Sequence, residues 1–461
     1  MSQINTIDLA TSPIWRVLQR GFVRNVALLA SGTAIGQGLG IAAAPLLSRL
    51  YDPSAFGVFG VYVAFVGILA TLSSWRYENA IVLPEKDDDA VNLMGVALIL
   101  VLVMSGVTAV GVATGGTYLS NILRVPELTT WLWFAPLSVL LIGVYQVFNY
   151  WSTRRKEFGR ITASRVAQSG GTVITQSLAS TFYLGAGGLI GGSIAGQAIG
   201  GALLLLRVGQ VESRRLLGYV RFQQLIRNMR AYSDFPKFSS PNVLVYELGG
   251  YAPIFMLAYF FQPTVVGAFV MAERIVRLPA WLISRSVQQV FLQQANEMHK
   301  AGERMHPFYA KVTIGLLALG ILPCGVVIAS GPALFSWFLG PDWEAAGDYA
   351  RWLALLVLGG FMMPTADSAG VILRAQRFLF GWNTVSVATR VAALGVGGYL
   401  RDPMVAVAGY CIFGFFFRVM IAIILGVRLM RDYSTRSGEP PRSFEELGRS
   451  MTVDEEIHKI P

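Results

Sequence analysis

The sequence predicts an all-α polytopic membrane protein, with about twelve transmembrane helices in two six-helix bundles and both termini in the cytoplasm. Hydrophobic residues make up 54% of the 461 residues, and the mean hydropathy is +0.54. Only 14% of the residues are charged, whereas an average soluble protein has about 25%. The third observation is a series of apolar stretches of about 20 residues each, the length that crosses a bilayer.

These stretches are expected to be helices, because a chain in lipid must satisfy its backbone polar groups internally. The first stretch is too long for the apolar region of a signal peptide. The twelve predicted spans are 25–48, 56–75, 90–113, 131–151, 163–183, 186–206, 240–261, 266–292, 308–329, 349–373, 378–399 and 404–427.

The basic residues fall in alternate connecting segments, which predicts the orientation of the chain. The segment 1–24 before the first span carries three arginines, and the 207–237 linker between spans 6 and 7 carries seven Lys and Arg residues. The 330–348 loop has three acids and no basic residue. The net charge of +10 then reflects cytoplasmic loops, and no nucleic-acid partner is expected.

Two echoes indicate an internal repeat. The segment PSAFGVF (53–59) follows span 1, and PTVVGAF (263–269) follows span 7. Trp131-Leu132 precedes Arg154 by nearly the same distance as Trp352-Leu353 precedes Arg374. The echoes predict two bundles in the same orientation, an arrangement that is common in transporters. The predicted organisation is an N-terminal segment 1–24, a bundle 25–206, a basic cytoplasmic linker 207–237, a bundle 238–427 and a polar cytoplasmic tail 428–461.

Span 6 carries glycines at every fourth position, which predicts the close approach of a neighbouring helix. These glycines are Gly192, Gly196 and Gly200.

Charged residues inside the predicted spans are candidates for function, because each costs at least a few kcal/mol in the bilayer. On span 8, three arginines and Gln288 share an arc of about 80°. The arginines are Arg274, Arg277 and Arg285 on span 8, with Arg165, Arg390 and Arg418 on spans 5, 11 and 12. The acids are Glu247, Glu273 and Asp367.

Six arginines against three acids favour a cavity that binds anions, because the guanidinium group bonds two phosphate oxygens at once. The acids are candidates to couple transport to H⁺ or Na⁺. Structural ion pairing and charges that reach back to the interface are the alternative explanation for each residue. No nucleotide loop, catalytic triad motif or metal-ligand spacing is present, so we expect no cofactor, no metal and no enzyme activity.

The first hundred residues resemble a known family. The segments that carry the resemblance are Arg49 to Gly57 (RLYDPSAFG), Arg76-Tyr77-Glu78 and Leu83 to Asp87 (LPEKD). They look like the amino-terminal part of the Wzx-like oligosaccharide flippases, polysaccharide transporters of the multidrug/oligosaccharidyl-lipid/polysaccharide (MOP) exporter superfamily. Beyond residue 100 the match is mainly one of architecture.

The resemblance implies alternating access by two bundles around a cationic cavity, in a monomer in the bacterial inner membrane. It implies a cargo of oligosaccharide linked to undecaprenyl pyrophosphate, a unit of O-antigen, capsule or exopolysaccharide that moves from the cytoplasmic to the periplasmic leaflet. Membrane lipid, a polysaccharide polymerase and a chain-length regulator are the implied partners. The family pattern also adds Arg49, Arg76 and Glu78 to the substrate-binding candidates.

Three other functions fit parts of the sequence. A drug/cation antiporter of the same superfamily would need an acidic cavity, which the arginine surplus opposes. A polysaccharide polymerase or glycosyltransferase commonly has a large outer loop, whereas the longest outer loops here are about 17–19 residues. A structural scaffold would gain nothing from buried charges.

Overall fold

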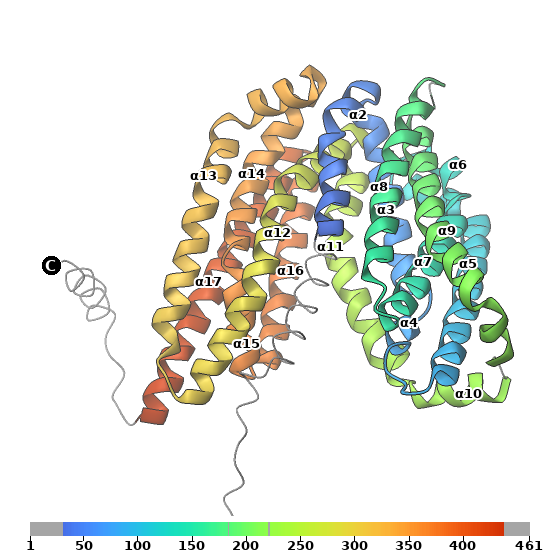
Figure 1. The fold of residues 1–461 in the computed structure, drawn as a ribbon. Helices are drawn as coiled ribbons and strands as arrows, with labels where there is room; N and C mark the ends of the chain where they lie inside the picture. The colour runs from blue at the N-terminus through green and yellow to red at the C-terminus, as the bar shows by residue number, and fades with distance from the viewer. Residues whose placement is uncertain (1–30, 183, 220–221, 438–461) are drawn as a thin grey trace, which may run out of the picture. The chain divides into compact units, whose positions relative to one another are not determined.

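The computed structural model describes residues 31–182, 184–219 and 222–437. Within these residues the regular structure is helical and contains no strand. A helical stretch at 31–42 precedes α2 (Figure 1). The elements that follow are α2 (Ala44–Leu50), α3 (Pro53–Thr71), α4 (Tyr77–Ala80), α5 (Asp87–Ile122), α6 (Leu128–Leu132), α7 (Ala135–Arg154), α8 (Phe158–Ser180), α9 (Ala186–Tyr219), α10 (Phe222–Ala231), η2 (Phe235–Ser239), α11 (Ser240–Phe260), α12 (Pro263–Ala301), α13 (Met305–Leu339), η3 (Pro341–Trp343), α14 (Glu344–Gly360), α15 (Met363–Ile372), α16 (Gln376–Tyr399) and α17 (Pro403–Ser437).

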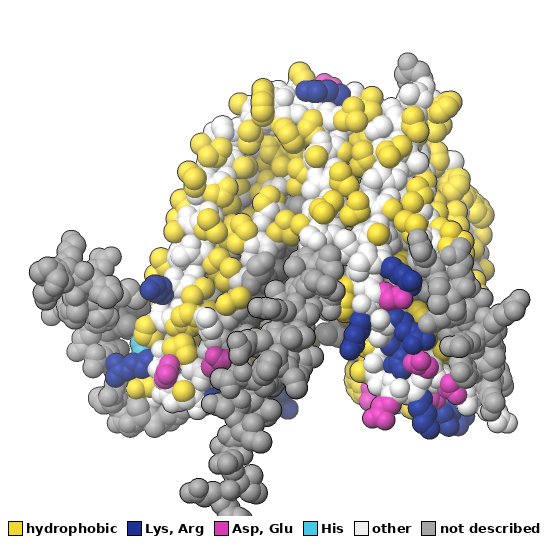
Figure 2. Space-filling view, in the orientation of Figure 1, with side chains coloured by type: hydrophobic (Ala, Val, Ile, Leu, Met, Phe, Trp, Pro, Cys, Tyr) yellow, Lys and Arg dark blue, Asp and Glu magenta, His cyan; other side chains and the backbone are white. Residues whose placement is uncertain are grey.

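Seven of the described helical segments are long and apolar enough to cross a membrane. Each of the twelve predicted spans lies mostly on helix where the structure describes it, although turns end or interrupt several of them, as at 72–75, 133–134 and 361–362. Hydrophobic side chains cover most of the helix surface that is visible in Figure 2, and the charged side chains gather near the helix ends. The protein is a multi-pass membrane protein, while the count of twelve spans and the orientation of the termini stay predictions.

Several helices extend beyond the predicted spans. Helix α5 continues to Ile122, and α9 continues to Tyr219 into the predicted linker. The loop predicted at 330–348 is shorter than expected, because α13 runs to Leu339 and α14 begins at Glu344. The backbone of α13 departs from helical geometry at Ser330 (φ −124°, ψ 19°). Pro332 follows two residues later, and its missing N–H and its ring account for the kink. The 1–24 segment lies outside the described residues, as does the tail beyond Ser437.

The chain divides into two compact units. Unit 1 comprises Met1–Ile275, Pro332–Tyr349 and Leu394–Met404. Unit 2 comprises Val276–Gly331, Ala350–Ala393 and Val405–Pro461. These units do not follow the boundaries of the two predicted bundles, so the bundle boundaries stay a prediction.

The first repeat echo marks two helix starts. Asp52 caps α3 by accepting a hydrogen bond from the Ala55 N–H at 2.7 Å, and Pro53 occupies the first turn, where its missing N–H costs nothing. Helix α12 begins in the same way at Pro263.

The two helix starts cross each other within unit 1. A Cβ added at Gly57 would overlap the carbonyl oxygen of Pro263, and a Cβ added at Gly267 would overlap that of Pro53. The contact is therefore reciprocal, as in a two-fold interface. The repeated glycine is what lets the two backbones touch.

The residues near the second echo end their helices in a similar way, although not at equal spacing. The turn after α7 has Lys156 in left-handed conformation (φ 58°), two residues beyond Arg154, and the turn after α15 has Arg374 itself in that conformation (φ 52°). The next N–H closes the same bond in each case, from Glu157 to Ser152 O and from Ala375 to Gly370 O, both 2.9 Å. This bond is the Schellman cap, at which glycine is usual and a basic side chain interacts favourably with the helix carbonyls.

Helices α8 and α9 lie side by side (Figure 1), and their contact confirms the predicted glycine ladder. A Cβ at Gly192, Gly196 or Gly200 would collide with α8 on successive turns, against Gln176, Thr172 and Gln168. Polar side chains of α8 also bond α9 carbonyls. Ser164 Oγ donates to Gly200 O at 2.7 Å. Small residues and hydrogen bonds of this kind hold helices together in lipid.

Candidate functional site

The first group of candidate residues is the arginine cluster of unit 2, which we define as Arg277, Arg390 and Arg418. The guanidinium carbon of Arg390 on α16 lies 4.0 Å from the centre of the Tyr410 ring on α17, a cation–π contact. Arg390 Nε is buried and has no hydrogen-bond partner among the described residues. Arg390 is therefore in contact with an aromatic face.

Arg418 on α17 is held by another neutral group. Its Nη1 donates to the carbonyl oxygen of Leu356 on α14. Glycines make room for both side chains. A Cβ at Gly360 would lie 3.2 Å from Arg418 Nη1, and a Cβ at Gly414 would lie 3.0 Å from Arg390 Nε.

The cluster is cationic. The charges of Arg390 and Arg277 both act on Arg418. Asp367 on α15 interacts electrostatically with Arg418 and is the acid that opposes them there. Arg277 and Asp367 are exposed, whereas Arg390 and Arg418 are partly buried. The structure therefore brings together four residues that the sequence singled out separately.

Two other predicted arginines lie in unit 1 against the 31–42 helix. Arg165 Nη1 donates to Thr33 Oγ1 at 2.6 Å. Arg274 packs against Gly40, where a Cβ would lie 2.5 Å from Arg274 Nη2. These contacts join α8 and α12 to the first helix, and the absence of a side chain at Gly40 leaves room for the second of them.

The remaining predictions have different outcomes. Arg49 is exposed in the last turn of α2, with no ligand group gathered around it in the described part of the chain. The side chain of Arg285 lies outside the described residues. Glu247 and Glu273 both interact electrostatically with Tyr251 of α11. Their role as coupling acids stays a prediction.

The Arg76–Glu78 turn, defined as residues 73–79, connects α3 to the short helix α4. The side chain of Glu78 is 1% exposed and that of Arg76 is 24% exposed. Arg76 Nη1 lies 3.5 Å from Glu78 Oε1. Ser74 Oγ donates to the other carboxylate oxygen. Burial raises the pKa of Glu78, although the Ser74 hydrogen bond and the Arg76 charge oppose this shift.

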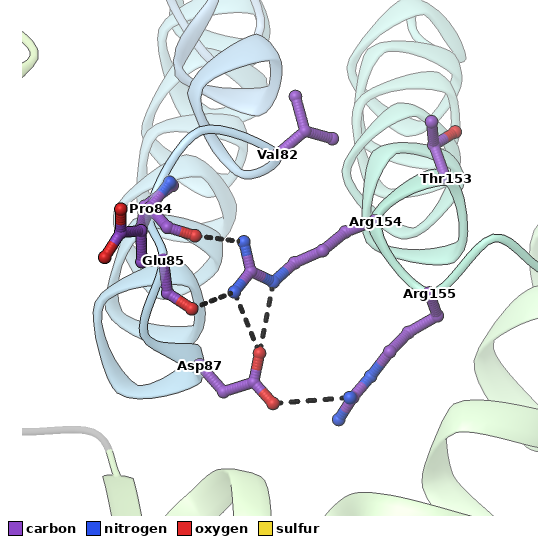
Figure 3. A pocket seen from close by; sticks show the side chains of 7 residues that line it. All are labelled: Val82, Pro84, Glu85, Asp87, Thr153, Arg154 and Arg155. Carbon is purple, nitrogen blue, oxygen red and sulfur yellow. Dashed lines mark hydrogen bonds and ion pairs between the residues drawn. The ribbon is translucent and has the colours of Figure 1, made fainter. Parts of the chain in front are cut away.

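A second polar cluster was not predicted. In the Arg154 cluster, Arg154 at the end of α7 donates to Asp87 Oδ1 at 2.9 Å and to the carbonyl oxygens of Pro84 and Glu85 (Figure 3). Arg155 contributes a second ion pair to Asp87 Oδ2 at 3.3 Å. These residues line a pocket of about 490 Å³.

The backbone and the aspartate of the LPEKD segment are the hydrogen-bond acceptors of one arginine. The signal in the sequence is the basic run STRRKEFGR (152–160) between predicted spans 4 and 5, which the charge pattern places in a cytoplasmic loop. Because the guanidinium group of Arg154 is already occupied, we assign it to structure and not to substrate.

Comparison with protein families identifies the chain. The model of the family described as "Polysaccharide biosynthesis protein" matches residues 46–348, about two thirds of the sequence. The chain belongs to this family. No curated protein matches the sequence.

Solved structures show where the fold occurs. The chain is similar to an inward-facing multidrug resistance MATE family transporter of the MOP superfamily, with a TM-score of 0.67 and 13% identity, over 87% of this chain and 94% of the other. It is also similar to the lipid II flippase MurJ in an inward closed conformation, with a TM-score of 0.65 and 11% identity, over 88% and 92%. A point mutant of the Vibrio cholerae MATE transporter VcmN matches with a TM-score of 0.58 and 13% identity, over 90% and 98%.

The family match confirms the resemblance to a family of polysaccharide biosynthesis proteins. At such low identity the structures establish the shared fold alone. That fold is found in a multidrug resistance MATE family transporter and in the lipid II flippase MurJ.

Proposed function

We propose that this protein is a flippase, which moves an undecaprenyl-pyrophosphate-linked oligosaccharide from the cytoplasmic to the periplasmic leaflet of the bacterial inner membrane. The observation that carries the proposal is the arginine cluster. Its three arginines stand on three helices that the sequence predicts to span the membrane, and two of them contact neutral groups, an aromatic ring and a backbone carbonyl.

The cost of these charges supports a functional role. On insertion scales an arginine at the centre of a span costs about 2.5–3.5 kcal/mol. Pairing each arginine with an acid would offset that cost more fully than the Tyr410 ring and the Leu356 carbonyl do. A pyrophosphate group supplies several negative oxygens, to which arginine bonds in bidentate fashion. The family match supports a saccharide cargo for this cationic site.

The test is complementation of a gene deletion by Arg390→Ala and Arg418→Ala variants. Loss of a charge-assisted hydrogen bond costs about 1.5–3 kcal/mol, so each variant should lower export roughly ten- to one-hundred-fold. Arg→Lys variants should retain part of the activity, because they keep the charge but lose the planar fork. Arg377→Ala is the matched control, since Arg377 is exposed near the start of the same helix as Arg390.

Surface polysaccharide and the lipid-linked intermediate in each leaflet are the readouts. Repeat units trapped on the cytoplasmic side support the flippase. Single repeats that reach the periplasm but do not lengthen indicate a polymerase instead. Unchanged polysaccharide with greater sensitivity to cationic drugs indicates the antiporter. Normal export from both alanine variants, at wild-type protein levels, would remove the cationic site from the proposal.

A further inference from the structure

The Arg76–Glu78 turn holds an uncommon arrangement of charge. Glu78 Oε1 is buried and accepts no hydrogen bond from the described residues, and its nearest described cation is Arg76 at 3.5 Å. A buried carboxylate that is not fully hydrogen-bonded is costly, so its charge depends on the Ser74 hydrogen bond and on Arg76.

The backbone holds Arg76 in this position. Trp75 and Arg76 both have positive φ angles, 50° and 65°. Each such residue other than glycine costs about 1–2 kcal/mol, and it persists only where the surrounding structure imposes it. With its amide oxygen facing Arg76, Asn79 accepts from Nη2 at 2.9 Å and donates to Tyr150 Oη at 2.6 Å. The guanidinium group is thus fixed from two sides.

Neighbouring elements add a second acid. Glu247 of α11 lies within range of the Arg76 charge. Tyr150 of α7 interacts electrostatically with both Arg76 and Glu78. With both acids ionised, one positive charge is opposed by two negative charges, and the turn repels an anion.

The other charged groups on packed elements are engaged or exposed. At the start of α5, Asp87 is bound by Arg154, and Asp89 is bound by Arg227 of α10. Lys237 of η2 is exposed. The Glu78 and Glu247 carboxylates therefore determine the net charge around Arg76.

We propose that Glu78 is a resident counter-anion, and that Arg76 binds the anionic pyrophosphate head group only after Glu78 has taken up a proton. The proposal rests on the proposed function, which supplies the anionic cargo. It makes Arg76 a proton-dependent anion site at a turn between two spans, separate from the arginine cluster.

The thermodynamics follow from linkage. A solvent proton added to the carboxylate leaves neutral Glu78, so that one opposing carboxylate, that of Glu247, remains near Arg76 instead of two. Anion affinity then rises as the pH falls, and by reciprocity anion binding raises the proton affinity of Glu78. The raised pKa of Glu78 in the folded protein moves this titration toward neutral pH. For one linked proton, affinity changes up to about tenfold per pH unit.

The experiment measures binding of radiolabelled undecaprenyl pyrophosphate to the purified full chain in detergent, from about pH 5.5 to about pH 8.5. Because the probe itself titrates, the quantity of interest is the ratio of wild-type to Glu78→Gln affinity. Gln mimics the protonated acid, so this ratio should approach one at low pH and fall at least tenfold at high pH. Arg76→Gln should lose the binding that depends on Glu78, whereas binding at the separate arginine cluster should remain at every pH.

Asp88→Asn is the matched control, because Asp88 is an exposed acid in the first turn of the following helix, and it should keep the wild-type profile. Infrared difference spectra between wild type and Glu78→Gln report the protonation state of Glu78 in the absence of ligand. A protonated carboxyl band that disappears over the same pH range is expected. A constant affinity ratio, or the absence of that band, would overturn the proposal while leaving the flippase intact. No binding by wild type at any pH would overturn both.

Discussion

At the scale of single residues, the role of an arginine depends on how many of its N–H donors are already bonded to neighbouring groups. Arg154 donates to two carbonyl oxygens and to a carboxylate, so its hydrogen-bonding capacity is spent within the protein. Arg390 contacts the aromatic ring of Tyr410, and its buried Nε has no hydrogen-bond partner among the described residues. The same residue type is structural in one place and available to a ligand in the other.

Arg154→Ala tests the structural role. The side chain of Arg154 is 12% exposed and its removal leaves Asp87 with Arg155 alone in this cluster. We expect a loss of about 1–3 kcal/mol, because the partners lose a charge-assisted donor. Thermal unfolding in detergent and proteolysis at residues 81–87 measure it. Arg155→Ala, the half-exposed neighbour, should cost less, and equal effects would contradict the assignment.

The sequence could predict which residues carry charge inside spans, but not which of them meet. Arg277 stands on α12, whereas Arg390 and Arg418 stand on the consecutive helices α16 and α17, and no spacing rule connects the three. The burial of Glu78 was likewise not predictable, because a four-residue helix between two spans gives no periodic signal. By contrast, the repeated segments at the starts of α3 and α12 were recognisable, since Pro and Gly there have local steric reasons.

At the scale of helices, close contacts depend on glycine. The ladder of α9 was predictable from its spacing, although its partner α8 was not. The crossing of α3 and α12 shows the same physics with backbone against backbone. In lipid the hydrophobic effect does not drive helices together, so such close packing carries more of the stability.

Gly57→Ala and Gly267→Ala test the crossing. The added methyl group would meet a carbonyl oxygen, which cannot move without shifting a helix. We expect each variant to lose about 1–3 kcal/mol. The double variant should cost less than the sum, because one shift relieves both overlaps. The melting temperature is the measurement. Gly106→Ala on α5 is the control, since a Cβ there meets no atom within 4 Å.

At the scale of the whole molecule, the predicted topology remains open to direct test. The charge pattern places residue 156 in the cytoplasm and residue 342 outside. Cysteine introduced by Lys156→Cys should react with an impermeant thiol reagent only in inside-out vesicles, and Asp342→Cys only in intact spheroplasts. Cys324 and Cys411 form no disulfide within the described residues and both are buried, so background labelling should be low. Labelling of both from the same side would contradict the twelve-span arrangement.

The crossing at Gly57 and Gly267 also determines when α3 can complete its packing during synthesis of the chain. Its two halves are separated by about 200 residues of chain, and at about 5–20 residues per second a ribosome needs roughly 10–40 s to make them. During that interval the start of α3, with the surface that Gly57 leaves open, is already in the bilayer without α12, the helix that packs against it. The nascent protein therefore presents an unfilled helix surface to lipid, to other membrane chains or to an insertion chaperone until α12 arrives.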